Sequence, residues 1–173
     1  MKTKYIILFL LGVIVTFLSC EDGNKNFTEE FDSVYYYQKE GVNEFDFYSV
    51  NNAKVQTITI GRGGHGLSGT STINLIPFTQ VEMDEYNQSI DGNYKLLAPQ
   101  YYDMPTSVVF EEGVEYRNVD VVFKGNMSEL AKTGEYMLPI RLEADYGTVN
   151  DNKSIVYFKP NIIVPSIIME PTG

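Results

Sequence analysis

The sequence predicts an all-β domain built as a sandwich of two sheets. Short segments rich in Val, Ile, Tyr and Phe recur along most of the chain, and several alternate apolar and polar residues with a period of two. Gly, Asn and Pro separate these segments, as they do between the strands of β-sandwiches. Because alternation gives a strand one buried and one solvated face, we expect two sheets that pack through their apolar faces.

Eight strands are expected along the chain. The strand at 136–143 has the clearest alternation, so we expect Leu138 and Ile140 to be buried and Arg141 to be exposed. Pro139 lies within this strand and lacks an amide donor, so we expect it on an edge strand or at a bulge. The complete set of expected strands is 34–37, 45–48, 55–60, 70–78, 107–110, 116–123, 136–143 and 154–164.

Helical structure is expected in only two short segments. The first is polar and covers residues 83–89, and the second covers residues 126–132 and starts near a capping Ser. The strand at 116–123 turns Asn118 and Asp120 to one face, and its other face carries Val119, Val121 and Phe123. No repeat or long helix interrupts the β pattern.

The first twenty residues resemble the signal peptide of a bacterial lipoprotein. Lys2 and Lys4 precede an apolar run at 5–18. The run is too short for a membrane-spanning helix, which needs about 20 apolar residues, and has the length of a signal-peptide core. The run ends at Ser19-Cys20, and a small residue directly before a cysteine is similar to the lipobox of these proteins. The resemblance implies cleavage before Cys20 and acylation of Cys20. The alternative is an ordinary secretory signal that is cleaved elsewhere.

Several segments, taken in order, resemble the domain-of-unknown-function 1735 family of Bacteroidota lipoproteins. They are Asp-Glu-Tyr-Asn at 84–87, Tyr-Lys-Leu-Leu-Ala-Pro at 94–99 with Tyr-Tyr at 101–102, Glu-Gly at 112–113 before the strand at 116–123, and Gly-Glu-Tyr-Met-Leu-Pro-Ile at 134–140. The resemblance covers residues 33–164 and implies an immunoglobulin-like β-sandwich. Members often precede glycan-binding or glycoside-hydrolase domains in polysaccharide-utilisation loci, and the resemblance supplies no catalytic residues.

Four segments are therefore expected: a signal peptide at 1–19, a flexible tether at 20–32, the β-sandwich at 33–165 and a tail at 166–173. The acidic residues directly after Cys20 resemble the surface-export signal of such lipoproteins. We expect an outer-membrane lipoprotein, held in the membrane lipid through Cys20 and exposed at the cell surface.

The charge of the chain disfavours nucleic acid as a partner. The sequence has 13 basic and 23 acidic residues, a net charge of −10. Removal of residues 1–19 takes away two lysines and no acid, which leaves 11 basic residues and a net charge of −12. Such a surface repels polyanions, so neutral or basic polysaccharides are the better expectation.

Few residues offer catalytic chemistry. His65 is the only histidine, which argues against a triad that uses histidine and against a zinc site with several imidazoles. It lies in the glycine-rich segment 61–69, which we expect to be an exposed loop whose glycines supply positive φ angles. We expect no enzyme activity, no cofactor and no metal site.

Acidic residues gather in two further segments. Glu111 and Glu112 are adjacent, so on a strand they would face opposite ways, and we expect a solvated turn there. Asp145 and residues 150–152 could supply oxygen ligands for calcium or form a hairpin turn, and their spacing matches no EF-hand loop.

Tyrosines are the better candidates for ligand binding, because sugar rings stack on exposed aromatic rings. A strand at 34–37 must turn at least one of its tyrosines outward, and Tyr36 is the candidate. Tyr101 and Tyr102 follow a turn-like segment that can present rings to solvent. The alternative is that these rings are buried, with their hydroxyls at the boundary. Asp-Ser-Val at 32–34 also resembles an O-glycosylation acceptor of Bacteroidota secreted proteins.

Two functions remain open. The first is a non-catalytic glycan-binding or adhesion accessory module, and the second is a structural or assembly protein that contacts other envelope proteins and binds no glycan. A group of exposed aromatic rings beside Asn or Asp would favour the first. A long unpaired edge strand with apolar flanks would favour the second.

Overall fold

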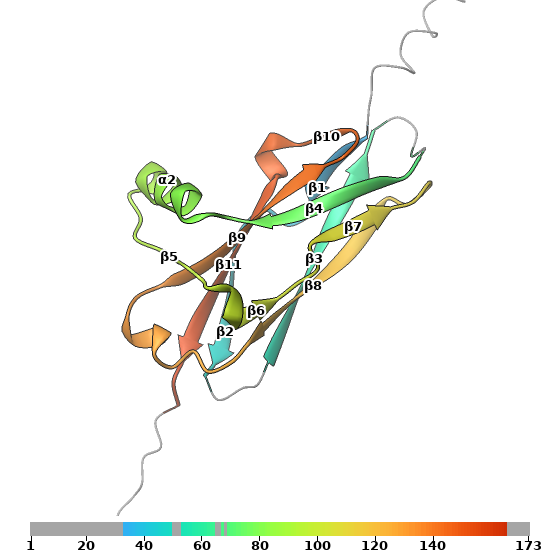
Figure 1. The fold of residues 1–173 in the computed structure, drawn as a ribbon. Coiled ribbons are helices and arrows are strands. Elements are labelled where there is room, and N and C mark those ends of the chain that lie inside the picture. Colours follow the sequence, from blue (N-terminus) through green and yellow to red (C-terminus); the bar gives the residue numbers. More distant parts are fainter. Residues whose placement is uncertain (1–32, 50–52, 65–66, 68, 166–173) are drawn as a thin grey trace, which may run out of the picture. The chain divides into compact units, whose positions relative to one another are not determined.

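The computed structural model describes residues 33–49, 53–64, 67 and 69–165, which form two β-sheets packed face to face (Figure 1). This arrangement confirms the predicted all-β, immunoglobulin-like β-sandwich. The expected signal peptide, tether and tail lie outside the described residues, as do Cys20 and His65. No helix among the described residues is long and apolar enough to cross a membrane.

The first sheet has five strands, in which β1 pairs with β10 in parallel and the other pairs are antiparallel. Its central strands β3 and β8 form the longest ladder of the sheet. In spatial order the strands are β10 (Thr148–Val149), β1 (Val34–Tyr37), β3 (Ala53–Gly63), β8 (Tyr116–Lys124) and β6 (Tyr102–Asp103).

The second sheet has six strands, and its edge strand β2 pairs with β11 in parallel. The short strand β5 (Lys95–Leu96) pairs with β9 in parallel, beside the main path of the sheet. Along that path the strands are β2 (Gly41–Tyr48), β11 (Ile155–Ile163), β9 (Tyr136–Ala144), β4 (Ser71–Pro77) and β7 (Ser107–Phe110). Three short 3-10 turns complete the domain: η1 (Pro99–Tyr101), η2 (Leu130–Lys132) and η3 (Asp151–Lys153).

All eight predicted strands are present, and two of them are clearly longer than predicted. β2 begins at Gly41 because its parallel ladder with β11 already pairs Gly41 with Val156. β3 continues to Gly63, which pairs with Val34, so part of the segment 61–69 is a strand and not a loop. The strands β5, β6 and β10 were not predicted, because two residues are too few to show alternation.

Aromatic side chains from both sheets fill the core between them. The ring centre of Phe123 lies 4.7 Å from the ring centre of Phe45 and 5.5 Å from that of Phe158. Tyr35 and Tyr37 are fully buried, and their hydroxyl groups have no hydrogen-bond partner within the described part of the chain. Burial raises the pKa of Tyr37 well above its ordinary value.

The alternation predicted for β9 is confirmed on its inner face. Leu138 and Ile140 are fully buried, and the side chain of Arg141 is 34% exposed. Met137 and Pro139 are also buried, although alternation alone would turn them to solvent. The outer face of β9 is therefore covered as well.

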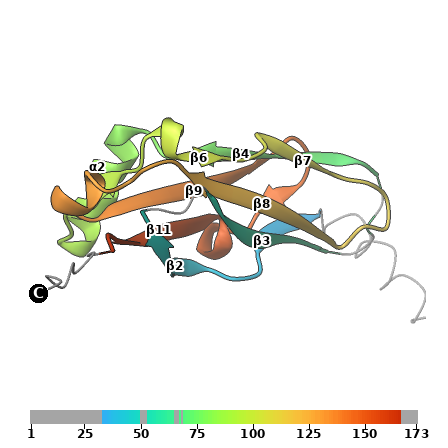
Figure 2. The same cartoon turned by 90° about the horizontal axis from the view of Figure 1, so that it is seen from below.

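The covering element is the helix α2 (Gln80–Ile90), which lies beside β9 and β11 at one end of the sandwich (Figure 2). The ring of Tyr86 stacks on that of Tyr157 in β11, with ring centres 4.6 Å apart. Glu82 also lies 3.3 Å from Arg141 of β9. These contacts place α2 over the outer face of the second sheet.

The helix begins three residues before the predicted segment 83–89 because of a capping box. The hydroxyl of Thr79 accepts a hydrogen bond from the Glu82 amide, and the Glu82 carboxylate accepts one from the Thr79 amide. The second predicted helix, at 126–132, is wrong except for the turn η2. Asn126 accepts from the amide of Ser128 instead, and this contact stabilises a turn.

Pro139 was predicted on an edge strand or at a bulge, and the first of these places is wrong because β9 is a central strand. β4 pairs with β9 only as far as Pro77 and Ile140, and the amide of Phe78 donates to the Pro139 carbonyl at 3.1 Å. The nitrogen and oxygen of a strand residue point to the same side. The missing donor of Pro139 therefore faces the end of β4, where the ladder stops.

Candidate functional site

The outer face of the first sheet brings two tyrosines from different strands together. Tyr35 and Tyr37 point into the core, so strand alternation turns Tyr36 to the opposite face. The register pairs Tyr36 with Gly61 of β3, and Gly61 with Tyr116 of β8. The three residues thus form a row across β1, β3 and β8.

The glycine in this row allows the ring of Tyr36 to lie flat over the backbone of β3. A Cβ atom on Gly61 would lie only 2.6 Å from Cζ of Tyr36, so the ring occupies space that any other residue at this position would need. A Cβ atom on Gly63, the next outward residue of β3, would lie 3.6 Å from the same ring. One face of the ring packs on the sheet, so the opposite face is directed away from it.

The second ring of the row, that of Tyr116, is 47% exposed. The side chains of Tyr36 and Tyr116 share a hydrogen bond. Burial raises the pKa of Tyr36, and this hydrogen bond and the nearby Glu115 raise it further, so Tyr36 is neutral at physiological pH. We call the two rings and the glycine beneath Tyr36, which are Tyr36, Gly61 and Tyr116, the tyrosine platform.

Polar side chains continue the same face along β3 and β8. The Thr59 hydroxyl donates to Asn118 Oδ1 at 2.8 Å, and the Thr57 hydroxyl donates to Asp120 Oδ1 at 2.6 Å. Within the described part of the chain, the Asn118 amide nitrogen and the second carboxylate oxygen of Asp120 have no protein partner. A donor and an acceptor therefore stand beside the tyrosine platform.

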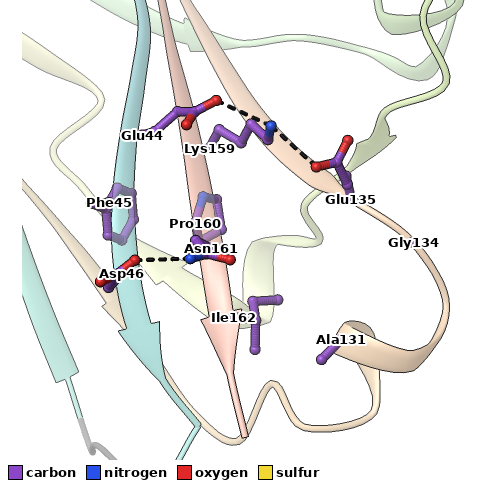
Figure 3. A pocket seen from close by; sticks show the side chains of 10 residues that line it. All are labelled: Glu44, Phe45, Asp46, Ala131, Gly134, Glu135, Lys159, Pro160, Asn161 and Ile162. Carbon is purple, nitrogen blue, oxygen red and sulfur yellow. Dashed lines mark hydrogen bonds and ion pairs between the residues drawn. The ribbon is translucent and has the colours of Figure 1, made fainter.

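A second candidate is a cleft of about 480 Å³ between β2, β11 and the segment before β9 (Figure 3). Its Lys159 lies 3.1 Å from both Glu44 and Glu135, and Asn161 donates to Asp46 at 2.9 Å. The hydrogen bond with Glu44, followed by that with Glu135, raises the pKa of Lys159. Because these groups bond one another across the cleft, we assign them a structural role.

The three tyrosines that were predicted to bind a ligand lie in different environments. Tyr36 lies on the tyrosine platform. Tyr102 pairs with the inward-facing Phe123, and both Tyr101 and Tyr102 pack against the core, so their rings are only partly exposed. The predicted turn before them is present as η1, but it does not lift the rings into solvent. Sequence reasoning missed Tyr116. It lies two residues before Asn118 in β8, so both side chains point to the same face of the strand.

The remaining candidates have structural roles within the described residues. Ser33 is buried, and its hydroxyl accepts a hydrogen bond from Arg62 Nε at 2.9 Å, so it is inaccessible to a glycosyl donor in the folded domain. Glu111 and Glu112 are exposed at a turn, as predicted. No group of three or more His, Cys, Asp or Glu among the described residues could hold a metal ion.

The segment between β9 and β11 is not the simple hairpin turn that was predicted. It contains β10, which pairs with β1 in the other sheet, and η3. Asp145 accepts hydrogen bonds from the Ser71 hydroxyl and the Thr72 amide, and the amide bond is the main cause of its lowered pKa. Asn150 accepts from the amide of Asn152. These oxygens therefore stabilise the connection.

Three solved structures from Bacteroides share this fold. A candidate carbohydrate-binding protein from Bacteroides ovatus is 18% identical, with a TM-score of 0.59 over 73% of this chain and 36% of that one. A multidomain protein including domain-of-unknown-function 1735, also from Bacteroides ovatus, is 12% identical, with a TM-score of 0.51 over 77% of this chain and 44% of that one. Bacteroides thetaiotamicron EndoBT-3987, solved with a Man5GlcNAc product, is 14% identical, with a TM-score of 0.51 over 73% of this chain and 30% of that one.

At these identities the likeness shows the fold alone, and this chain spans less than half the length of each structure. No curated protein matches the sequence. A family model for an N-terminal domain matches residues 27–148, which is well over half of the chain. The chain therefore belongs to the family of N-terminal domains that this model describes.

Proposed function

We propose that this domain is a non-catalytic, glycan-binding accessory module and that the tyrosine platform is its binding surface. The observation that carries the proposal is the Tyr36 ring, which lies flat on Gly61 beside the exposed Tyr116. An aromatic ring with one open face can stack on the apolar face of a sugar. Asn118 and Asp120 stand next to it as donor and acceptor for hydroxyl groups.

The similar structures support a role connected with glycans. One is described as a candidate carbohydrate-binding protein, and another was solved with a glycan product. The multidomain structure that includes domain-of-unknown-function 1735 supports the proposal that this chain is a member of that family. The proposed absence of catalysis rests on the resemblance in the sequence, which supplies no catalytic residues.

We also propose that Cys20 is acylated and holds the protein in the outer membrane, with the domain at the cell surface. The support is the lipobox-like sequence that ends at Cys20 and the acidic residues that follow it. Several acyl chains suffice for stable anchoring, since each buried methylene contributes about 0.8 kcal/mol. A location at the cell surface would bring the tyrosine platform into contact with extracellular polysaccharides.

The alternative, a structural or assembly protein without a glycan ligand, depends on an open edge strand. β2 has eight residues and a partner on one side only, and its Val42 and Tyr48 are partly exposed. However, the charged Glu44 and Asp46 lie between these two apolar residues on the same face, and Lys54 donates to the backbone carbonyl of Asp46 at 2.7 Å. Charges and a capped carbonyl protect an edge against strand addition.

Affinity electrophoresis against a panel of neutral polysaccharides tests the proposal. The full chain, purified in detergent, should be retarded by at least one of them. Tyr146→Ala is a matched control, because Tyr146 is 58% exposed but lies outside the tyrosine platform. If no polysaccharide retards the folded protein, the structural alternative replaces the proposed function.

A further inference from the structure

A shallow hollow lies at the opposite end of β8 from the tyrosine platform. Its volume is about 350 Å³, and its lining combines apolar side chains with two carboxylates. The residues that line it are Asp103, Met104, Pro105, Asp120 and Val122.

The hollow and the tyrosine platform lie on the same face of the first sheet. The register pairs Val122 with Asp103 of β6 on one side and with Val55 of β3 on the other. The residues Val121 and Phe123 point into the core, so Val122 points outward like Tyr116. Val55, which is 51% exposed, adds apolar surface beside the hollow.

The residues between the two features form a continuous strip along β8. Tyr116, Asn118, Asp120 and Val122 are alternate residues of this strand, and each step of two residues advances about 6.7 Å. The strip from Tyr116 to Val122 is therefore about 20 Å long. Between its two ends, the donor of Asn118 and the acceptor of Asp120 face solvent.

We propose that this strip is one extended binding site with two subsites, for a linear polysaccharide rather than for a single sugar or a disaccharide. The inference rests on the proposed function of the tyrosine platform. One sugar stacks on Tyr36, and a sugar further along the chain places its C–H face on Val122 in the hollow. The intervening sugars exchange hydrogen bonds with Asn118 and Asp120.

Charge further defines the polysaccharide class. Asp103 and Asp120 line the hollow, and Lys124 lies 3.7 Å from Asp103. Uronic acids and sulfated sugars would place anions against these carboxylates, whereas neutral sugars would offer them hydroxyl donors. The strip therefore fits a neutral glycan.

A length series tests this inference. Isothermal titration of the full chain in detergent would use the polysaccharide that binds best in the panel and its oligosaccharides, from the disaccharide upward. Affinity should rise with length until the glycan spans the strip of about 20 Å, and then remain constant. Val122→Lys, which fills the hollow, should weaken binding of the longest oligosaccharide about 5-fold and leave the disaccharide unchanged.

The controls separate this inference from the proposed function. Val109→Lys places the same charge on β7, at a residue that is 46% exposed in the other sheet, and should bind like the wild type. Tyr36→Ala should weaken the disaccharide and the long glycan alike. Wild-type affinity that does not depend on length, or Val122→Lys that binds the long glycan normally, would overturn the two-subsite inference alone. The absence of any glycan binding would overturn the proposed function as well.

Discussion

Substitution of Gly61 by alanine should displace the Tyr36 ring while both tyrosines remain in the protein. The new Cβ atom would lie 2.6 Å from Cζ, 2.8 Å from Cε2 and 2.9 Å from the hydroxyl oxygen of Tyr36. Ordinary contacts begin at 3.4 Å, so the ring must move by about 0.8 Å or swing off the sheet. Either movement also disturbs its hydrogen bond with Tyr116.

The stability of the domain should change little. The clash involves the far end of a flexible side chain and no backbone atom. Alanine also loses less conformational freedom on folding than glycine does. We expect the free energy of unfolding to stay within about 1 kcal/mol of the wild-type value, which a chemical denaturation curve would measure.

Glycan affinity, in contrast, should fall about 5-fold, because one stacked ring contributes about 1 kcal/mol. Isothermal titration would measure this loss with the best-binding neutral polysaccharide. In a Tyr36→Ala background, Gly61→Ala should have no further effect on affinity, since no ring is left to displace. This double-mutant cycle separates a lost ring from a general change in the sheet.

Gly63→Ala provides the matched control. Its Cβ atom would lie 3.6 Å from the Tyr36 ring, which is an ordinary contact, so affinity should be unchanged. The reasoning is refuted if Gly61→Ala binds as tightly as the wild type, or if Gly63→Ala weakens binding as much as Gly61→Ala does.

Three further predictions concern stability and anchoring. Leu138→Ala should lower the free energy of unfolding by about 2–5 kcal/mol, because Leu138 is fully buried; an unchanged melting curve would contradict its place in the core. Hydrogen bonds from Thr79 lower the pKa of Glu82, so its capping contribution is present at neutral pH and is lost as the pH falls from the ordinary pKa of Glu through this lowered value. The stability difference between the wild type and Glu82→Gln should accordingly shrink on acidification, and a constant difference would contradict it. Cys20→Ala should abolish labelling by a palmitate analogue and release the protein from membranes, whereas retained label would place the acylation elsewhere.

Strands with a strict period of two were predictable because burial of one face fixes the pattern locally. The strand predicted at 136–143 is β9 (Tyr136–Ala144), and Leu138 and Ile140 are buried as predicted. The outer face of β9 was not predictable from β9 itself, because α2, a separate segment, covers it. For the same reason the alternation of β9 did not reveal that Met137 is buried.

The tyrosine platform could be predicted only in part. Alternation within 34–37 indicates that Tyr36 points outward, but it does not indicate which residue lies beside it. Gly61 and Tyr116 reach it through the register of β1 with β3 and of β3 with β8, which joins segments far apart in the sequence. Tyr101 and Tyr102 adjoin a real turn, and their partial burial follows from the short strand β6, whose two residues carry no periodic signal.

The most direct test of the glycan-binding claim is titration of the wild type and of the double variant Tyr36→Ala/Tyr116→Ala with the best-binding neutral polysaccharide. The Tyr146→Ala variant serves as a control for loss of an exposed tyrosine. We predict that the wild type and the control bind equally and that the double variant, still folded, loses at least about 10-fold in affinity. Equal binding by all three proteins would contradict the assignment of the tyrosine platform as the binding surface.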